Sequence, residues 1–269
     1  MKVLGRRAKT EKKRGRRIFL LRRRYVTAAA AVLTVCGICV AANMPAAISA
    51  AAATRQLPIY CVQRDQKICS LSFDAAWGNE DTEELIQILE QYQVKATFFV
   101  VGDWVEKYPE SVKALHDAGH EVMNHSNHHD HYNSLTAEQI VADVTACNEK
   151  IAAVTGVTPT LIRCPYGEYD DHVITAIRSM GMEPIQWDVD SLDWKDLSAA
   201  EITQRVTSRV KPGSICLFHN AALNTPEALP SILEYLGAEG YTIVPISQIL
   251  LDCAYCMDHE GRQCPVETT

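Results

Sequence analysis

The sequence predicts an α/β protein: a distorted or incomplete (β/α) barrel of about seven βα units, preceded by an N-terminal transmembrane helix. From Lys67 onward, short apolar runs alternate with amphipathic ones, and glycines recur where the amphipathic runs end. A run of 30 residues without charge, from Tyr25 to Thr54, predicts the membrane helix. The 269 residues, 47% apolar and 22% charged, are typical of a globular protein and exclude disordered or fibrous classes.

The alternation can be followed element by element. Apolar runs rich in β-branched and aromatic residues predict strands at 68–73, 95–101, 120–124, 160–163, 183–189, 214–218 and 241–244. Amphipathic runs predict helices at 81–91, 111–117, 136–154, 170–180, 199–210, 226–237 and 247–252. Strands that alternate with helices form parallel sheets, and about seven such units in one stretch favour a single barrel over two domains.

The ends of the chain differ from its middle. The first 24 residues hold 12 Lys or Arg and one Glu, which leaves a net charge of −18 for the remainder. We expect a basic cytoplasmic tail (1–24), a transmembrane anchor (25–45), a linker (46–66), the barrel domain (67–252) and a Cys-containing tail (253–269). A basic flank orients an apolar span, which explains it more simply than nucleic-acid binding does. A cleaved signal peptide, which would give a secreted protein, is the alternative.

Ten cysteines are many for an exported protein. Six of them fall in the apolar span or in predicted strands and helices, where buried free thiols are expected. The other four lie outside regular elements: Cys61, Cys253, Cys256 and Cys264. They could form disulfides, could stay free in an anaerobic envelope, or could join His259 in a zinc site with the spacing C-x2-C-x2-H-x4-C.

A pair of histidines follows the predicted strand at 120–124. His125 and His129 are four residues apart, and two neutral imidazoles at this spacing can bind one divalent ion. Such an ion polarises a carbonyl group and makes a water molecule nucleophilic at neutral pH. The pair therefore predicts a metal-assisted hydrolase.

Other chemically active residues also stand at the ends of predicted strands. Asp74, Arg163, Asp190 and His219 each follow a strand within a few residues, as His125 does. The carboxyl ends of parallel strands form one rim of a barrel, where catalytic residues gather. We therefore expect all five side chains to meet at this rim.

Five motifs in this order resemble those of a known enzyme family. They are Leu71-Ser72-Phe73-Asp74, His125-Ser126-x-x-His129, Arg163-x-Pro165-Tyr166-Gly167, Asp190-x-x-Asp193-Trp194 and Leu217-Phe218-His219. From about residue 57 to 250 the chain thus resembles the polysaccharide deacetylases, the NodB-homology domains of carbohydrate esterase family 4. The segments 73–78 and 191–195 are most similar to its sporulation-associated, PdaB-type branch in Firmicutes.

The resemblance implies a role for each motif residue. Asp74 would be the catalytic base and Arg163 its tether, while His219 would be the general acid with Asp193 beside it. The backbone N–H of Tyr166 would bind the oxyanion. The implied substrate-binding residues are Trp77, Pro165, Trp194 and Leu217.

One position departs from the family pattern. The first motif usually continues with a second Asp that binds the metal, and this chain has Ala75 there. His125 and His129 would then hold a divalent metal weakly, with waters or a substitute ligand. We expect zinc, with cobalt, nickel or manganese as alternatives. The candidates for a substitute ligand are Asn79, His128 and Asp130.

These features predict an extracytoplasmic, membrane-anchored hydrolase that removes N-acetyl groups from cell-wall glycan. The expected substrates are the N-acetylglucosamine or N-acetylmuramic acid residues of peptidoglycan, with a place in sporulation implied by the resemblance. A catalytically silent glycan-binding or scaffold protein is the alternative, because of Ala75. A deacetylase of another acetylated polysaccharide is a further one. No nucleic-acid partner is expected, and no feature assigns an oligomeric state.

Overall fold

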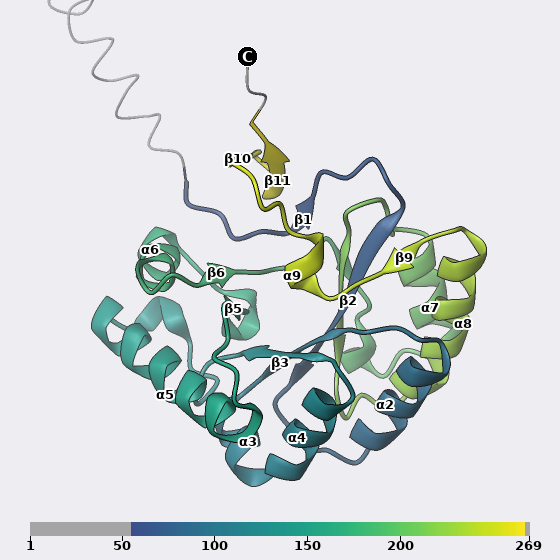
Figure 1. The fold of residues 1–269 in the computed structure, drawn as a ribbon, viewed down its shortest axis with the longest axis horizontal. Helices are drawn as coiled ribbons and strands as arrows, with labels where there is room; N and C mark the ends of the chain where they lie inside the picture. The colour runs from purple at the N-terminus through teal and green to yellow at the C-terminus, as the bar shows by residue number, and fades with distance from the viewer. Residues whose placement is uncertain (1–54, 267–269) are drawn as a thin grey trace, which may run out of the picture. The chain divides into compact units, whose positions relative to one another are not determined.

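The computed structural model describes residues 55–266 (Figure 1). The predicted basic tail, the predicted anchor at 25–45 and the first part of the predicted linker lie outside the described residues. Among the described residues, every helix is too short or too polar to cross a bilayer. The membrane prediction therefore rests on the sequence alone.

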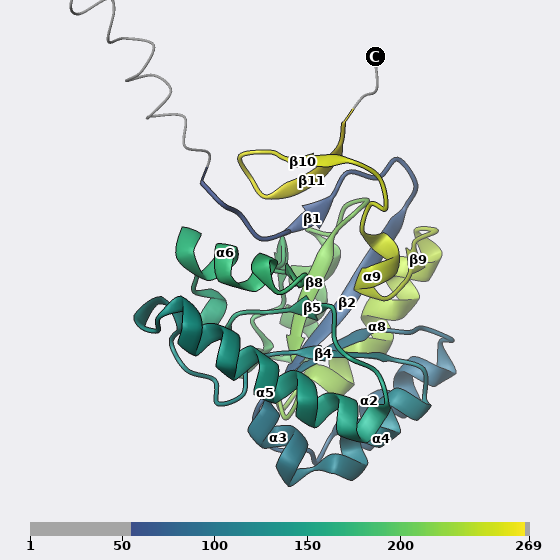
Figure 2. The ribbon, with the colours of Figure 1, turned by 60° about the vertical axis from the view of Figure 1, so that its left-hand side comes forward.

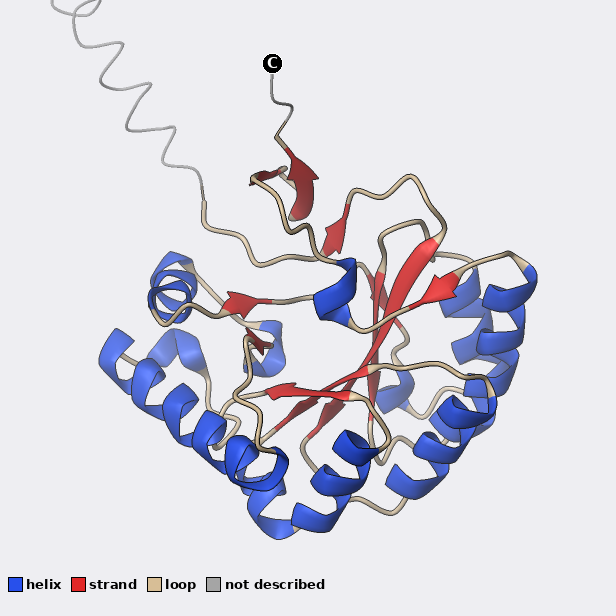
Figure 3. Ribbon diagram, viewed as in Figure 1, coloured by secondary structure: helices blue, strands red, loops and turns tan. Residues whose placement is uncertain are grey.

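A curved parallel sheet forms the centre of the fold (Figure 3). Its strands run in the spatial order β6-β5-β4-β3-β2-β8-β7, and β9 pairs with the start of β2. Their bounds are β2 Ile68–Ala75, β3 Thr97–Val100, β4 Glu121–Asn124, β5 Leu161–Ile162, β6 Glu183–Pro184, β7 Val189–Asp190, β8 Ile215–His219 and β9 Thr242–Ile243. All of these pairings are parallel, as the βα alternation predicts.

The barrel is incomplete where one expected strand forms two short strands, β6 and β7. The sequence predicts a single strand at 183–189, but β6 pairs with β5 at one end of the sheet and β7 with β8 at the other. The few residues between them span at most about 17 Å, so the sheet must curl to bring its ends together. Ile59, from the predicted linker, bridges Ile185 in this gap. The described residues before β2, from Gln56 on, are thus part of the folded unit.

Helices α2 to α8 cover the outside of the sheet in Figures 1 and 3, whereas α9 packs Ile246 and Ile249 against its inner face. Their bounds are α2 Thr82–Gln91, α3 Gly102–Lys107, α4 Pro109–Asp117, α5 Ala137–Thr155, α6 Asp171–Ser179, α7 Ala199–Thr207, α8 Thr225–Ala238 and α9 Ile246–Ile249. The sequence reading missed α3, which is only six residues long. Both α5 and α7 begin with a capping box, in which Thr136 and Ser198 accept from the N–H of the residue three positions on.

The alternation of side chains along β2 separates the core from the site. Leu71, Phe73 and Ala75 belong to the main hydrophobic core, where the Phe73 ring stacks on other aromatic rings. Ser72 and Asp74 point to the opposite face and are buried there. Strand β2 therefore packs against the helices with one face and presents polar groups to the barrel interior with the other.

A second, smaller sheet joins the two ends of the described chain (Figure 2). It has the order β1-β11-β10, with β1 at Cys61–Val62, β10 at Tyr255–Met257 and β11 at Arg262–Pro265. The N–H of Val62 also donates to the carbonyl of Gly213, just before β8 begins. This sheet therefore lies at the amino ends of the barrel strands, away from the rim where the site forms.

Candidate active site

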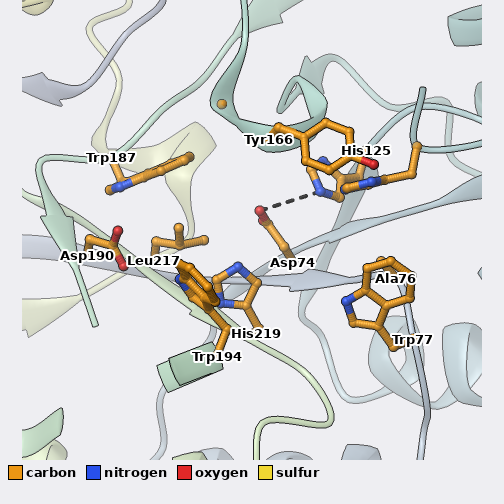
Figure 4. A pocket seen from close by; sticks show the side chains of 12 residues that line it. Asp74, Ala76, Trp77, His125, Tyr166, Trp187, Asp190, Trp194, Leu217 and His219 are labelled. Atoms are coloured by element: carbon orange, nitrogen blue, oxygen red, sulfur yellow. Dashed lines mark ion pairs between the residues drawn. The ribbon is translucent and has the colours of Figure 1, made fainter. Parts of the chain in front are cut away.

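A cavity of about 510 Å³ opens at the carboxyl ends of the barrel strands (Figure 4). Its lining residues come from the ends of β2, β7 and β8 and from the loops after β4, β5 and β6. They are Asp74, Ala76, Trp77, His125, His129, Tyr166, Gly167, Trp187, Asp190, Trp194, Leu217 and His219. The predicted rim therefore exists, and most of the predicted site residues lie on it.

Asp74 occupies the centre of the cavity in Figure 4 and forms an ion pair with Arg163. The Nη1 of Arg163 donates to Asp74 Oδ1 at 2.7 Å, and both side chains are buried. Burial works against the carboxylate, but the charge and the hydrogen bond of Arg163 outweigh it and lower the pKa of Asp74. Asp74 is therefore an ionised carboxylate inside the protein.

Arg163 itself is held rigidly. Its Nη2 donates to Ser72 Oγ at 2.9 Å and to the carbonyl of Gln186 at 3.2 Å. The guanidinium carbon lies 4.3 Å from the centre of the Phe99 ring, a cation–π contact. Because the side chain is 0% exposed, its charge must be balanced from inside the protein, and Asp74 supplies that balance.

His219 stands beside Asp74 and is paired with Asp193. Asp74 and His219 are direct register partners on β2 and β8, so their side chains project on the same face. The Nδ1 of His219 lies 2.8 Å from Asp193 Oδ1. Burial opposes the imidazolium, but the hydrogen bond and charge of Asp193 outweigh burial and raise the pKa of His219. A proton-accepting and a proton-donating group thus face one space.

Both carboxylate oxygens of Asp193 accept hydrogen bonds. Its Oδ2 accepts from the backbone N–H of His219 at 2.8 Å and from Thr225 Oγ1 at 2.7 Å. Its Oδ1 accepts from the backbone N–H of Trp194 at 2.9 Å in addition to the His219 ring. A completely buried carboxylate with four donors keeps one orientation, which also fixes the His219 ring.

His125 and His129 lie on the other side of Asp74. The Nδ1 of His125 donates to the carbonyl of Arg163 at 2.8 Å, which leaves Nε2 as an acceptor 3.5 Å from Asp74 Oδ2. Burial lowers the pKa of His125, and burial with the nearby His125 lowers that of His129 to about 4. The two ring centres are 5.0 Å apart, and the buried Nδ1 of His129 has no hydrogen-bond partner. Two neutral nitrogens are therefore available to a ligand.

The predicted substitutes for the missing carboxylate lie elsewhere. Asn79 donates to Ser111, and His128 bonds to Asp103 at the surface. Asp130 is exposed. Across the part of the chain that the structure describes, no three His, Cys, Asp or Glu side chains gather as a metal site. The two imidazoles of His125 and His129 are therefore the groups that would hold a divalent ion, and water would supply the remaining ligands.

Aromatic side chains form the walls of the cavity. Trp77, Tyr166 and Trp194 are all more than half exposed at its rim, and Leu217 lines its interior. Exposed aromatic rings around a mostly apolar pocket with a few polar groups suit a sugar, whose apolar face can stack on them while its hydroxyl groups stay hydrated. Pro165 differs from the prediction, because it is buried beneath the wall and does not line the cavity. It begins the turn in which Tyr166 adopts a left-handed backbone conformation, with φ 58°.

Sequence reasoning missed two contributors to the site. Trp187 lines the cavity and packs near Arg163, but its position inside the predicted strand at 183–189 concealed it. Gln186 holds Arg163 through its carbonyl and the turn at Gly167 through its side chain, at 3.1 Å. Both lie in the segment between β6 and β7, where the barrel is interrupted.

Comparisons with known proteins agree with this geometry. The family model for polysaccharide deacetylases matches residues 62–185. The solved structure of peptidoglycan deacetylase PdaC from Bacillus subtilis is 33% identical and covers 70% of this chain and 92% of that chain, with a TM-score of 0.63. This chain belongs to the polysaccharide deacetylase family. A pseudoenzyme of this family, carbohydrate esterase family 4 (CE4), from Bacillus anthracis is 33% identical over 71% of this chain and 68% of that chain, with a TM-score of 0.69.

Two curated proteins from Bacillus subtilis are also similar to this chain in sequence. YlxY, an uncharacterized protein, is 31% identical over 193 residues, which are 72% of this chain and 60% of YlxY. The peptidoglycan-N-acetylmuramic acid deacetylase PdaC is 32% identical over 70% of this chain and 40% of its own length. The match thus spans less than two thirds of either relative. A mutant of the Bacillus anthracis pseudoenzyme is described as having restored enzymatic activity.

Proposed function

We propose that this protein is a polysaccharide N-deacetylase that hydrolyses the N-acetyl groups of N-acetylglucosamine or N-acetylmuramic acid in peptidoglycan. The observation that carries the proposal is the adjacency of two charge pairs in one pocket, Asp74 with Arg163 and His219 with Asp193. Amide hydrolysis needs a base for the attacking water, donors for the oxyanion and an acid for the departing amine. The names of related peptidoglycan deacetylases support the choice of substrate.

In the first step, Asp74 takes a proton from a water molecule as that water attacks the acetamide carbonyl. Arg163 keeps the carboxylate ionised and directed into the cavity, because it binds Oδ1 while Oδ2 faces His125. The carbonyl oxygen gains negative charge as the tetrahedral intermediate forms. We assign the backbone N–H of Tyr166, at the left-handed turn, to that charge.

In the second step, the carbon–nitrogen bond breaks and the sugar nitrogen leaves as an amine. His219 donates the proton that the departing nitrogen needs, because Asp193 favours its protonated form. Acetate and a free amino sugar are the products. Trp77 and Trp194 would hold the sugar ring across the opening, and Leu217 would contact the acetyl methyl group.

His125 and His129 would hold a divalent metal, zinc being our first choice. When bound, the ion would draw electron density from the acetamide carbonyl and ease deprotonation of a nearby water. With two protein ligands, the ion would be held more weakly than in a site with a carboxylate ligand. Added metal should therefore be required for full activity.

We further propose that the enzyme is anchored in the cell membrane and acts outside the cytoplasm. The uncharged run of 30 residues behind a strongly basic flank supports this placement. An outward-facing domain beside the membrane meets cell-wall glycan first. The motif resemblance at 73–78 and 191–195 supports a place in sporulation, where the envelope is rebuilt.

Acetate release from chito-oligosaccharides and from peptidoglycan tests the chemistry. Asp74→Asn and His219→Ala should each lower the rate by about 10²–10⁴-fold, because each removes one proton-transfer group. Asp117→Asn on α4, an exposed carboxylate outside the cavity, is the matched control and should leave the rate unchanged. Wild-type rates in both cavity variants would exclude the assigned roles.

A second function, catalytically silent glycan binding, is favoured by one observation. Ala75 replaces the expected metal-binding carboxylate, and no described side chain takes its place in the cavity. In that case Trp77 and Trp194 would still bind glycan, which can be followed by quenching of their fluorescence. Binding of chito-oligosaccharides without acetate release at any metal concentration would establish this function in place of the first.

A further inference from the structure

The small sheet at the amino ends of the barrel strands contains two cysteines placed directly opposite each other. In the antiparallel pair of β10 and β11, Cys256 and Cys264 are register partners. The flanking ladder bonds run from Val266 N–H to Ala254 and from Asp258 N–H to Arg262. Cys256 and Cys264, midway between them, therefore occupy a hydrogen-bonded pair, whose Cα atoms are about 5.5 Å apart. That separation lies within the range of about 4.4–6.8 Å seen for disulfides.

The other thiols of the sheet and its surroundings are out of reach. Cys61 on β1 is the register partner of Arg262, so it is a diagonal neighbour of Cys264, about 7–8 Å away. Strand β11 separates Cys61 from Cys256. Cys253 lies in the bend before β10, outside the strand pairing, and has no register partner on β11. A disulfide needs Cα atoms within about 7 Å, which excludes Cys61 as a partner of Cys264.

Accessibility distinguishes the same two cysteines from the buried ones. Cys256 is exposed and Cys264 is partly exposed, whereas Cys61 and four cysteines of the barrel are buried. Burial raises the pKa of Cys61 to about 12, which keeps it a thiol that does not react with oxidants. Burial and the charge of Asp258 raise the pKa of Cys264, with a smaller contribution from Cys256. Among the described cysteines, only this pair is both adjacent and accessible.

We propose that Cys256 and Cys264 are a disulfide-forming site that locks the hairpin of β10 and β11. The oxidant would be a disulfide, either of a thiol oxidoreductase or of a small molecule. Cys256, the more exposed thiol, attacks it as the thiolate, forms a mixed disulfide and releases one oxidant thiol. Cys264 then attacks the Cys256 sulfur and releases the second. Two electrons pass to the oxidant, and two protons end on its thiols.

The position of the hairpin gives this bond a structural consequence. The N–H groups of Tyr60 and Gln63 donate to the carbonyls of Gly261 and Gln263, at 2.9 Å each. The hairpin thereby holds the segment through which the chain enters the barrel. Closing the short loop between Cys256 and Cys264 removes open conformations of the hairpin. The disulfide would therefore secure the entry of the chain without touching the catalytic cavity.

Peptide mapping of the full-length protein tests the pairing. The protein is equilibrated with glutathione disulfide, free thiols are alkylated, and the chain is cut with trypsin, which cleaves after Arg262, and chymotrypsin, which cleaves after Tyr255. We expect residues 263–269 linked to residues 256–262, with Cys253 alkylated. Alkylation of both Cys256 and Cys264 under oxidising conditions, or a link from Cys264 to Cys253 or Cys61, would overturn the proposal.

The rate of chymotryptic cleavage after Tyr255 in the intact protein tests the lock. Oxidation should slow this cleavage by roughly fivefold or more in the wild type and in the control variant Cys253→Ser, because the hairpin opens less often. Cys256→Ser and Cys264→Ser should be cut at the fast rate with or without oxidant. Equal rates for oxidised and reduced wild type would refute the lock, even if the bond forms.

Discussion

The two sides of the cavity differ in how completely their polar side chains are hydrogen-bonded. On one side, Asp193 accepts four hydrogen bonds and holds His219 in a single orientation. On the other side, His125 is anchored through Arg163, but the buried Nδ1 of His129 has no partner. The proton-donating side is thus satisfied by the protein alone, whereas the histidine side keeps a buried nitrogen without a protein partner.

The alternation of side chains along β2 explains why alanine at position 75, in place of the expected carboxylate, costs the fold little stability. On β2, Asp74 faces the cavity and Ala75 packs in the hydrophobic core, where it is 1% exposed. A small apolar side chain suits that position, while a carboxylate there would need a metal or another partner. The fold therefore accommodates alanine at this position, and our proposal predicts that any metal is bound more weakly as a result.

Arg163→Met should have the largest effect, because Arg163 supplies the positive charge that balances the buried Asp74 at the centre of the cavity. The change leaves the buried Asp74 carboxylate without its cation and should destabilise the protein by about 3–5 kcal/mol. Chemical denaturation followed by circular dichroism measures this loss, and acetate release should fall below detection. A double variant with Asp74→Asn should recover part of the stability. Unchanged stability in Arg163→Met would mean that the pair is not the anchor of the site.

Asp193→Asn should have the next largest effect and should be confined to the proton-donating side. Removing the charge that raises the pKa of His219 should lower the rate of acetate release by about 10²-fold. The pH dependence of stability should change as well. In the wild type, the raised pKa of His219 gives stability that is present below pH 6.5 and is lost as the pH rises through the folded-state value.

The Asp193→Asn variant should lack that loss of stability at rising pH. Denaturant unfolding of both proteins across the neutral range provides the measurement. If the free energy of unfolding changed with pH in the same way in both proteins, Asp193 would not set the protonation of His219.

Ala75→Asp should improve the histidine side by about 10-fold in metal affinity if the last residue of β2 can turn a carboxylate from the core to the rim, where β3 alone separates it from β4 and the following His125. Zinc titration by calorimetry measures the affinity, and acetate release at limiting zinc should rise in parallel. Without metal, the variant should be less stable than the wild type, since the new carboxylate is buried. Ala76→Asp, at a cavity-lining position, is the matched comparison. If only Ala76→Asp gains affinity, the ligand position lies on the cavity face of the strand.

Thr225→Val should have the smallest effect, because it removes one of four donors to Asp193 and nearly preserves the side-chain shape. The expected cost is about 1–3 kcal/mol in stability, with only a few-fold loss in rate. Thr203→Val, in which a half-buried hydroxyl on α7 contacts the carbonyl of Ala228, is the control for threonine removal. If Thr225→Val lowered the rate more than Asp193→Asn does, the charge of Asp193 would not be the main contribution to the proton-donating side.

The sequence predicted the parallel α/β architecture and the convergence of the site because both follow from periodicity. Asp74, His125, Arg163 and His219 follow apolar runs, and the structure brings them to one rim. The membership of the deacetylase family is confirmed by the comparisons. These results depend on local patterns, which a single sequence contains.

The features that the sequence did not reveal depend on contacts between distant segments. The predicted strand at 183–189 divides because Ile59, more than 120 positions earlier, pairs with Ile185 at its centre. The same interruption places Gln186 and Trp187 at the site. The tail was predicted as an irregular segment with cysteines, but its pairing with β1 organises it into a sheet. The predicted zinc site in that tail does not form among the described residues.

Mass spectrometry of peptidoglycan fragments tests the central claim most directly. Purified fragments are incubated with the full-length protein and added zinc, cobalt, nickel or manganese, with the Asp74→Asn variant as the control. The account predicts fragments that lose the mass of one acetyl group exchanged for hydrogen, in the wild type and not in the variant. Unchanged masses with every metal, while the fragments bind and quench tryptophan fluorescence, would contradict the proposed deacetylase activity.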